Sequence, residues 1–555
     1  MWVRTATVAV FLAYTAALVW QARVTGLTYD EPAHLAAGYM YWRGEDRLEP
    51  PDAPPLTRLV EGWVPLALDA PLQQDTEQWR KGEQWAVGTQ MLDAMGPEGA
   101  RRLTFLSRLP MLVFPLLLLG VAWAWVRELL GPTAALAATA MLALEPNLLG
   151  HGALIKSDVP AATGLLALAY CTWRYWRHPS RGRFWVLAIV AALAIQTKFT
   201  VQAAFPLVGL AVLTRHALDK RWTTAALRLA LLAATAYLFA AALHQFDLIR
   251  IHGPEFEHIA VKESWSDAER ASWAWWPPVP MPARWVEGIA FVRKHSRELG
   301  FRSYFMGRVS YGGDPLYFPV TMALKLPIPL QALVLVGLTL FGWRLARRTA
   351  TAEEAFLWLP GLLLFGLAMQ SKINIGYRHV MPLTPLFFLG ALFSMRALWS
   401  KRAWRLAAGF GMVWLAAESA WIFPHGISYF NQWAGGPDNG WRYLADSNID
   451  WGQDWPEVAR YADKHGIEMV EFAYFGQDRP WHYLPGHRVH TLPTPFCGSC
   501  VDGEVFEPKP GFYAISVNLL LGYYWDEPYR DYFRYFRGRE PDAKAGYSIF
   551  LYDLR

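Results

Sequence analysis

The stretch Thr5–His34, "TATVAVFLAYTAALVWQARVTGLTYDEPAH", joins an apolar run directly to a polar segment. One Arg precedes the run Thr5–Trp20, and Arg, Thr and acidic residues follow it, where a secretory signal would have small residues at its cleavage site. The stretch therefore predicts an uncleaved membrane anchor. Immediately beyond the anchor it presents Asp30, Glu31 and His34, a position at which ionisable side chains need an explanation.

The composition is that of a membrane protein. Of 555 residues, 54% are hydrophobic and only 18% are charged, and 29 are Trp. The net charge of +5 does not suggest nucleic-acid binding. Three Cys are too few for a disulfide scaffold, and we expect Cys171, which lies in an apolar run, to be inert packing.

Apolar segments recur through the first 423 residues of the chain. By the criterion of about twenty residues per span, they predict about eleven transmembrane helices, several of them short. We therefore expect an all-α polytopic membrane protein. The segments are Thr5–Trp20, Leu103–Val126, Ala134–Leu149, Ala161–Trp173, Phe184–Ile195, Ala203–Leu213, Ala225–Leu243, Tyr317–Phe341, Ala355–Met369, Val380–Phe393 and Leu406–Phe423.

The distribution of Arg and Lys predicts the topology of these helices. Basic residues cluster at Arg174–Arg183, Arg215–Arg221, Arg344–Arg348 and Arg396–Arg405. If all of these clusters are cytoplasmic, the stretch Phe184–Leu213 crosses the membrane twice, as two short helices. The odd number of spans then places the N-terminus inside and the C-terminal segment outside.

The same reasoning divides the chain into two parts. Residues 1–423 form a transmembrane domain with large outer loops at 24–102 and 245–315, and residues 424–555 mix short β-like runs with helical ones. We expect the second part to be a compact extracytoplasmic α/β domain. The Trp- and Pro-rich stretch 273–285 predicts an interfacial belt that rests on lipid headgroups, with a lipid-chain groove as the alternative.

The acidic pair beyond the first anchor has two interpretations. On a helix, Asp30 and His34 are four residues apart and Glu31 and His34 are three apart, so all three side chains can point into one cavity. Alternatively, the acidic residues only mark a solvated helix start, which the helix dipole favours. In a partly desolvated cavity, a carboxylate beside a like charge titrates above its ordinary pKa of about 4, which would make Asp30 a useful base.

Other outer turns carry polar groups that match this pair. Any one of them can be an anchor that reaches toward the headgroups. However, cations are scarce on the outer face by the positive-inside rule, so Lys198, Arg378 and His379 oppose the bias of the rest of the chain. Carboxylates that face cations suit a reaction between a lipid-linked phosphate and a polar acceptor. The carboxylate would act as the base, and the cations would stabilise the phosphate as it leaves. The turns contain His151, Lys156 and Asp158, then Lys198, and then Lys372, Arg378 and His379.

Several ordered motifs carry a family resemblance that covers nearly the whole chain. They include "YDEPAH", "EPNLLGHGALIKSDVP", "QTKFT", "GGDPLYFPVTMALKLPIPL", "GYRHVMPLTPLFFLGA" and "YFNQWAGGPDNGWRYLADSNIDWGQDWPEVARY". This set resembles the bacterial phospholipid carrier-dependent glycosyltransferases of the protein O-mannosyltransferase-like group, family 39, whose membrane fold is called GT-C. The resemblance implies an enzyme of the bacterial inner membrane that transfers a sugar from a polyprenyl-phosphate donor to a protein, lipid or glycan. The transfer would take place on the extracytoplasmic side, with inversion at the anomeric carbon.

The resemblance also implies roles for individual residues. Asp30 and Glu31 would be the catalytic residues, with Asp30 as the general base or the carboxylate that positions the acceptor and Glu31 as its neighbour in acceptor or sugar binding. His34 would bind substrate and matches a His that often follows the pair. Lys198, Arg378 and His379 would neutralise the departing carrier phosphate, and His151 and Asp158 would line the wall of the second loop. Asp52 and Ala53 stand where the family more often has a polar or His residue. We therefore expect no cofactor, with a divalent metal as the alternative.

Two further motifs and two competing functions stay open at this point. "CGSC", Cys497 to Cys500, favours a local structural disulfide over a redox pair or half a zinc site. "DSNIDWGQDW" is either a structural cap or part of the acceptor entrance.

A transporter is the main alternative function, but the apolar runs are nearly free of charge, and a transporter would have ionisable residues at the bilayer midplane. A lipid-binding envelope protein without catalysis is the other.

Overall fold

The computed structural model describes residues 1–45, 48, 53–262, 265–266, 270–271, 273, 279–495, 505–526 and 528–555. The structure is mostly helical, and each of the eleven predicted apolar segments overlaps at least one helix. The corresponding helices are α1 (Trp2–Val24), α8 (Val113–Leu130), α9 (Pro132–Ala143), α11 (Asp158–Arg177), α12 (Arg181–Ala194), α14 (Phe205–Leu218), α15 (Trp222–Leu243), α20 (Ile328–Ala346), α21 (Ala352–Ala368), α22 (Thr384–Ser394) and α23 (Arg402–Ile422).

The chain is an integral membrane protein. Among the described residues, five helical segments are long and apolar enough to cross a membrane: Trp2–Val24, Gly96–Leu130, Phe199–Leu218, Trp222–Leu243 and Ile328–Ala346. The second of these joins α7 (Gly96–Met111) to α8, and the third joins α13 (Phe199–Gln202) to α14. The total of eleven spans stays a prediction.

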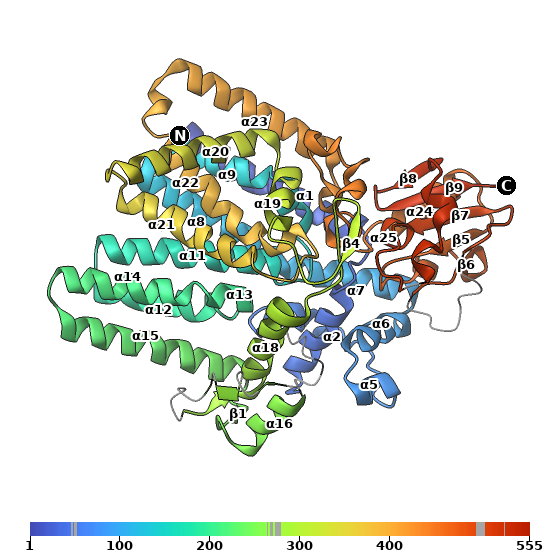
Figure 1. The fold of residues 1–555 in the computed structure, drawn as a ribbon, viewed down its shortest axis with the longest axis horizontal. Coiled ribbons are helices and arrows are strands. Elements are labelled where there is room, and N and C mark those ends of the chain that lie inside the picture. Colours follow the sequence, from blue (N-terminus) through green and yellow to red (C-terminus); the bar gives the residue numbers. More distant parts are fainter. Residues whose placement is uncertain are drawn as a thin grey trace.

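The helices run side by side, with the N-terminus and the C-terminus at opposite ends of the bundle (Figure 1). The turn between α14 and α15, which carries one of the basic clusters, lies at the left end, and the C-terminal sheet lies at the right. Local signals explain where individual helices begin. For example, Thr351 and Glu354 form a capping box at the start of α21, directly after a basic cluster.

The C-terminal segment contains a mixed five-stranded sheet in the order β6-β5-β7-β9-β8. The strands are β5 (Val470–Ala473), β6 (Val489–Thr491), β7 (Phe512–Ser516), β8 (Ala543–Ala545) and β9 (Ile549–Asp553). Strand β5 pairs parallel to β6 and β7, whereas β9 pairs antiparallel to β7 and β8. The predicted β-like runs therefore form the central strands β5 and β7.

One helix of this segment illustrates how its sequence dictates packing. In α24 (Trp455–Lys464), Trp455, Val458, Ala459 and Ala462 are buried, at the i, i+3, i+4 and i+7 spacing of one helical face. These side chains join a small core with sheet residues. The short helices α25 (Val517–Leu520) and α26 (Arg534–Arg537) complete the segment.

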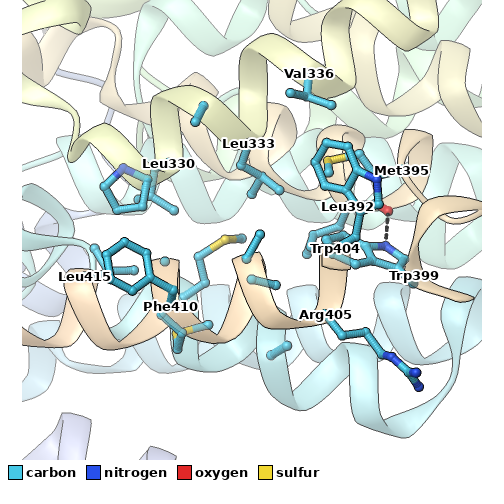
Figure 2. A pocket seen from close by; sticks show the side chains of 18 of the residues that line it. Leu330, Leu333, Val336, Leu392, Met395, Trp399, Trp404, Arg405, Phe410 and Leu415 are labelled. Carbon is cyan, nitrogen blue, oxygen red and sulfur yellow. Dashed lines mark hydrogen bonds between the residues drawn. The ribbon is translucent and has the colours of Figure 1, made fainter. Parts of the chain in front are cut away.

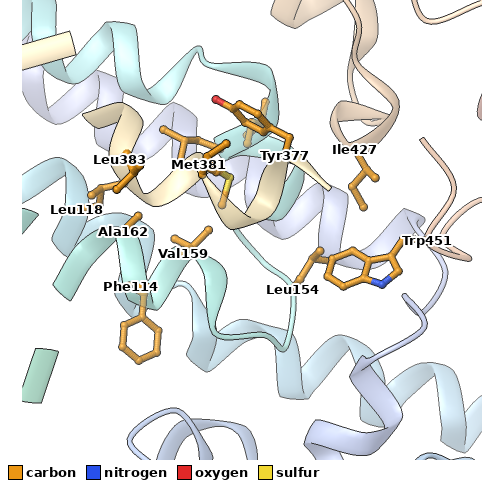
Figure 3. Close-up of a cluster of buried hydrophobic side chains, with 14 of the residues drawn as sticks. Phe114, Leu118, Leu154, Val159, Ala162, Tyr377, Met381, Leu383, Ile427 and Trp451 are labelled. Atoms are coloured by element: carbon orange, nitrogen blue, oxygen red, sulfur yellow. The ribbon is translucent and has the colours of Figure 1, made fainter. Parts of the chain in front are cut away.

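A larger apolar core is shared between the helices and the C-terminal segment. Figure 3 shows Phe114, Val159 and Met381 of the helical part in the same cluster as Ile427 and Trp451 of the C-terminal part. Packing across position 423 holds the two parts together. The domain boundary predicted there and the extracytoplasmic position of the second part stay predictions.

The remaining elements lie mostly in the two long loops. The first loop holds α2 (Glu31–Trp42), α3 (Arg58–Glu61), α4 (Trp63–Ala67), α5 (Glu77–Lys81) and α6 (Gln84–Ala94); the second holds β1 (Leu248–Ile249), α16 (Pro254–Lys262), β2 (Met281–Pro282), α18 (Ala283–Lys294), β3 (Ser303–Phe305) and β4 (Arg308–Ser310). Helices α10 (Pro146–His151) and α19 (Tyr317–Lys325) connect neighbouring long helices.

The Trp- and Pro-rich stretch is described only at residues 273 and 279–285, so Trp275 and Trp276 lie outside the described residues. Trp273 is buried and stacks on Trp265, with ring centroids 5.8 Å apart, in a small core beside α16 and α18. At Trp273 itself, the structure shows internal packing in place of the predicted contact with headgroups.

An apolar groove of about 730 Å³ runs along α9, α20, α22 and α23. Figure 2 shows Leu330, Val336, Leu392 and Phe410 among its lining side chains, with Trp399 and Trp404 near one end.

Candidate active site

The site is built around the start of α2, which is clamped between two other helices. A Cβ on Gly88 of α6 would lie 2.0 Å from the carbonyl oxygen of Pro32, and a Cβ on Gly62 would lie 1.9 Å from the carbonyl oxygen of Gly38. Only glycine permits these approaches, because any side chain would collide with backbone. Gly88 therefore fixes the first turn of α2 and Gly62 fixes the middle of this helix, which Asp30 caps and Glu31 begins.

Glu31 is completely buried and forms a bidentate ion pair with Arg108 of α7. Arg108 Nε lies 2.8 Å from Glu31 Oε1, and Arg108 Nη2 lies 2.6 Å from Glu31 Oε2. The backbone amides of Thr28 and Ile155 also donate to this carboxylate, at 2.7 and 3.1 Å. Arg108 donates its remaining hydrogens to the carbonyls of Ala22, Thr25 and Gly26.

The expectation that Asp30, Glu31 and His34 share one cavity is therefore wrong for Glu31. Its carboxylate has no exposed surface and accepts hydrogen bonds from two backbone amides and a guanidinium. A buried carboxylate needs such partners to offset its desolvation, and they leave it turned away from Asp30. The sequence predicted the proximity of the pair but not its opposite orientations.

Asp30 faces a group of cations. Its Oδ2 atom lies 2.9 Å from Lys156 Nζ and 3.5 Å from Arg378 Nη1. The Asp30 side chain is 14% exposed, whereas those of Lys156 and Arg378 are 6% and 8% exposed, so the carboxylate is the most accessible member of the group.

The expected rise in the pKa of Asp30 is also wrong. Burial raises this pKa, but the charges of Lys156 and Arg378 outweigh burial and hold it below its ordinary value. Glu31 was expected to contribute like-charge repulsion, but Arg108 neutralises it. Two cations therefore replace the predicted like charge as the neighbours of Asp30.

His34 joins this group through Lys156. Lys156 Nζ lies 3.0 Å from His34 Nε2, and His34 Nδ1 lies 3.3 Å from Glu61 Oε2. With Lys156 protonated, its ammonium donates to Nε2, so a neutral imidazole carries its proton on Nδ1 and donates to Glu61. His34 thus holds Lys156 in reach of Asp30.

A second carboxylate, Asp158, lies on the other side of Arg378. Asp158 Oδ1 pairs with Lys198 Nζ at 2.5 Å, and its Oδ2 lies 3.8 Å from Arg378 Nη1. Burial raises the pKa of Asp158, but Lys198 and Arg378 together keep that pKa below its ordinary value. Lys198 directly precedes α13. Residues from four separate parts of the sequence therefore meet here: Asp30, Lys156 with Asp158, Lys198 and Arg378.

Arg378 is the centre of the cluster and is held by the C-terminal segment. Its Nε atom donates to Ser447 Oγ at 3.0 Å, and its guanidinium lies 4.3 Å from the ring centroid of Trp451. The amide of Tyr377 donates to Asn448 Oδ1 at 2.9 Å. The motif "DSNIDWGQDW" therefore supports the segment that carries Arg378.

The two remaining predicted histidines lie at the edge of this cluster. His151 Nδ1 lies 2.9 Å from the carbonyl oxygen of Asn147, and the rings of His151 and Trp451 are 6.0 Å apart. Burial lowers the pKa of His151 to about 4, so the ring is neutral at pH 7. Nε2 of His151 and Nε2 of His379 have no hydrogen-bond partner among the described residues. Both nitrogens are buried.

Sequence reasoning missed several members of the site. Arg108 is a charge inside a predicted apolar span, which is a usable signal, but it was not assigned to the site. Glu61 carried no distinguishing signal. Ser447 and Trp451 lie in the motif "DSNIDWGQDW", whose role the sequence left open. Lys372 was predicted on the same outer face. Its backbone amide donates a hydrogen bond to the carbonyl of Ser296, and its carbonyl accepts one from the amide of Phe301.

The remaining sequence predictions concern a metal ion and the Cys pair. Within the described ranges, no group of three or more His, Cys, Asp or Glu side chains is arranged to hold a metal ion. Asp52, Cys497 and Cys500 lie outside the described residues.

Comparison with known proteins agrees with the motifs. Residues 102–239 match the family described as dolichyl-phosphate-mannose-protein mannosyltransferases, so the predicted resemblance to this class of glycosyltransferases is confirmed in this segment. No curated protein matches the sequence.

Three solved structures align with this chain over most of its length. Apo ArnT from Cupriavidus metallidurans aligns with a TM-score of 0.48 and 13% identity, over 99% of this chain and 98% of that chain. ArnT bound to undecaprenyl phosphate aligns with a TM-score of 0.45 and 13% identity, over 98% and 97%. Archaeal oligosaccharyltransferase AglB from Archaeoglobus fulgidus, in complex with an inhibitory peptide and a dolichol-phosphate, aligns with a TM-score of 0.43 and 11% identity, over 93% and 70%.

Proposed function

We propose that the chain is a membrane glycosyltransferase that moves a sugar from a polyprenyl-phosphate donor to a nucleophilic acceptor, with inversion at the anomeric carbon. The observation that carries this proposal is the convergence of Lys156, Lys198 and Arg378 on Asp30 and Asp158. Among the side chains joined by these contacts, three cations face two carboxylates, which leaves one of these positive charges in excess. An anionic phosphate complements that charge, and the family match in residues 102–239 supports the same donor class.

In the proposed reaction, the acceptor oxygen attacks the anomeric carbon while the bond from that carbon to the phosphate oxygen breaks. The bonding electrons leave with the carrier phosphate, and the acceptor proton passes to Asp30. Arg378 suits the phosphate, because Ser447 and Trp451 fix its planar guanidinium and planar guanidinium groups bind phosphate oxygens bidentately. Lys198, His379 and His151 lie close enough to shape the same anion site.

The low pKa of Asp30 fits this reaction once the donor is included. Without donor, Lys156 and Arg378 keep Asp30 ionised and therefore weakly basic. A phosphate beside these cations would compete for them and add negative charge, and both effects raise the pKa of the carboxylate. Asp30 would become an effective base only when the donor is bound.

Glu31 has a different proposed role. Its carboxylate binds the amide of Ile155, and the next residue, Lys156, binds Asp30. We therefore assign Glu31 as a positioning residue in place of the catalytic role predicted from the sequence.

The proposed location is the bacterial inner membrane, with the site on its extracytoplasmic side and a protein, lipid or glycan as acceptor. The Arg and Lys distribution supports this orientation. A reporter active only in the cytoplasm, fused after Arg555, should be silent in cells. Strong reporter activity would overturn the proposed orientation.

The central experiment measures transfer from a synthetic polyprenyl-phosphate sugar by purified wild-type protein and Asp30→Asn. Because Asn keeps the size but not the charge, donor binding should survive while turnover falls about a hundred- to ten-thousand-fold. Arg442→Ala, which removes an exposed Arg stacked on Trp441, serves as the control. Near-wild-type turnover by Asp30→Asn would contradict the assignment, and donor binding without any transfer by the wild type would favour the non-catalytic lipid-binding alternative.

A further inference from the structure

A polar pocket of about 430 Å³ lies between the first outer loop and the C-terminal segment, and none of its lining residues belongs to the cation cluster. Its walls come from α5, α6 and the residues that follow β5, and Figure 1 shows α5 and α6 projecting below the C-terminal sheet. The size is within the range of small-molecule sites. The lining includes Gln78, Trp85, Thr89, Gln90, Gln477 and Arg479.

The amide groups of this pocket are only loosely bonded to one another. Gln90 Nε2 lies 3.3 Å from Gln78 Oε1, and Thr89 Oγ1 lies 3.4 Å from Gln477 Oε1. These distances are at the long, weak end of the hydrogen-bond range, so the groups gain by binding a better partner. A side-chain amide donates and accepts at once, which matches the donor and acceptor character of a hydroxyl group. Three such amides suit a ligand with several hydroxyls.

The other lining residues indicate which chemical class of ligand the pocket can bind. Trp85 is 36% exposed and presents an aromatic surface, on which the C–H face of a sugar ring can stack. The charged lining residues are Glu83 and Arg479. Arg479 is paired with Asp93, at 3.1 Å from Nε to Oδ2, so the pocket does not select an anion. Apolar lining is limited to Trp85 and Ala86, which disfavours a lipid chain or an apolar peptide side chain.

The pocket is adjacent to the proposed catalytic carboxylate. Thr89 follows Gly88, whose contact with Pro32 brings α6 against the first turn of α2. From the other wall, Gln477 hydrogen-bonds the Tyr29 hydroxyl, one residue before Asp30. The residues that line the pocket therefore adjoin the chain on both sides of Asp30, at Tyr29 and near Pro32.

From this arrangement we infer that the pocket binds a neutral saccharide, and that this saccharide is part of the acceptor. The first half of the inference stands on the lining alone. The second half rests on the proposed function, because it names the acceptor class of that reaction as a glycan or a glycosylated molecule.

The test uses full-length protein in nanodiscs with the Asp30→Asn substitution, which prevents turnover. Saturation-transfer NMR measures binding of methyl glycosides of glucose, mannose and galactose, of N-acetylglucosamine and of cellobiose. We expect saturable binding of at least one saccharide and about a fivefold loss of affinity in Trp85→Ala, since ring stacking contributes about 1 kcal/mol and each 1.4 kcal/mol is tenfold. Because Trp85 is partly exposed, this change should leave the unfolding temperature unaltered.

Trp433→Ala is the matched control, because Trp433 is 65% exposed and is not among the pocket lining. Absence of binding by every saccharide, equal binding by Trp85→Ala, or competition for the pocket by a Ser- and Thr-rich peptide alone would overturn the inference. If saccharides bind but wild-type protein transfers no sugar from polyprenyl-phosphate donors, the pocket stands and the proposed function fails. The two failures are therefore distinguishable.

Discussion

Asp30 and Glu31 are neighbours in the sequence, yet the fold places them in opposite environments. Asp30 is partly exposed and faces two cations, Lys156 and Arg378, that have other partners as well. Glu31 is fully buried and faces one guanidinium, Arg108, whose N–H groups donate to Glu31, to backbone carbonyls and to the Thr25 hydroxyl. One carboxylate is available for chemistry, and the other is committed to structure.

The difference shows that two adjacent acidic residues can have separate roles, one in structure and one in the proposed reaction. Glu31 binds the Ile155 amide and so fixes the loop from which Lys156 reaches Asp30. The structural carboxylate thereby sets the electrostatics of the reactive one. Substitutions on the two sides should produce different kinds of loss, and the following predictions are ordered by the size of the effect.

The largest effect is expected when Arg108 is removed. Arg108→Ala leaves Glu31 buried without its counter-ion, and breaking a buried pair in this way costs about 3–5 kcal/mol. Thermal unfolding of the purified protein should show a large drop in the midpoint. Lys81→Ala, which breaks an exposed pair with Glu77, should leave the midpoint unchanged. A stable Arg108→Ala protein would show that the anchor is dispensable.

Removal of Arg378 should affect the donor more than the fold. Arg378→Ala deletes charge-assisted hydrogen bonds worth about 1.5–3 kcal/mol, which corresponds to about a ten- to hundred-fold loss in kcat/KM for the polyprenyl-phosphate sugar. Steady-state kinetics with varied donor would measure the loss, and thermal unfolding would check the fold. Unchanged donor kinetics in a folded variant would remove Arg378 from the phosphate site.

The smallest expected effect concerns pH and the contact between α6 and the C-terminal segment. His482 lies 3.3 Å from Asp93 and 3.5 Å from Asp478. Burial lowers the pKa of His482, but these carboxylates outweigh it and raise the pKa to about 8 from 6.5. The stabilisation is therefore complete below about pH 6.5 and is lost as pH rises through about 8.

Unfolding midpoints of wild type and His482→Gln, measured across this pH window, test the prediction. The difference between the two proteins should shrink as the pH rises. A constant difference would mean that His482 contributes by packing and not by its charge.

Much of the helical framework was predictable, because membrane helices are marked by local composition. Each apolar run overlaps a helix, and "EMVEFAYFG" and "GFYAISVNLLLG" contain the central strands of the C-terminal sheet. The orientation of side chains at the site was not predictable in the same way. A spacing of three or four places residues on one helical face, but Glu31 is the first residue of α2, where the partners of the preceding loop decide its direction.

By itself, the sequence determined that the chain enters a membrane, where its helices and strands form, and which motifs resemble a glycosyltransferase family. These properties depend on residues near one another in the chain, through hydropathy, periodicity and charge bias. Only the tertiary structure decided which polar groups meet. Asp30, Lys156, Lys198 and Arg378 come from four separate parts of the sequence. Their distances, and therefore the pKa of Asp30 and the burial of Glu31, depend on how the helices pack, which no local pattern specifies.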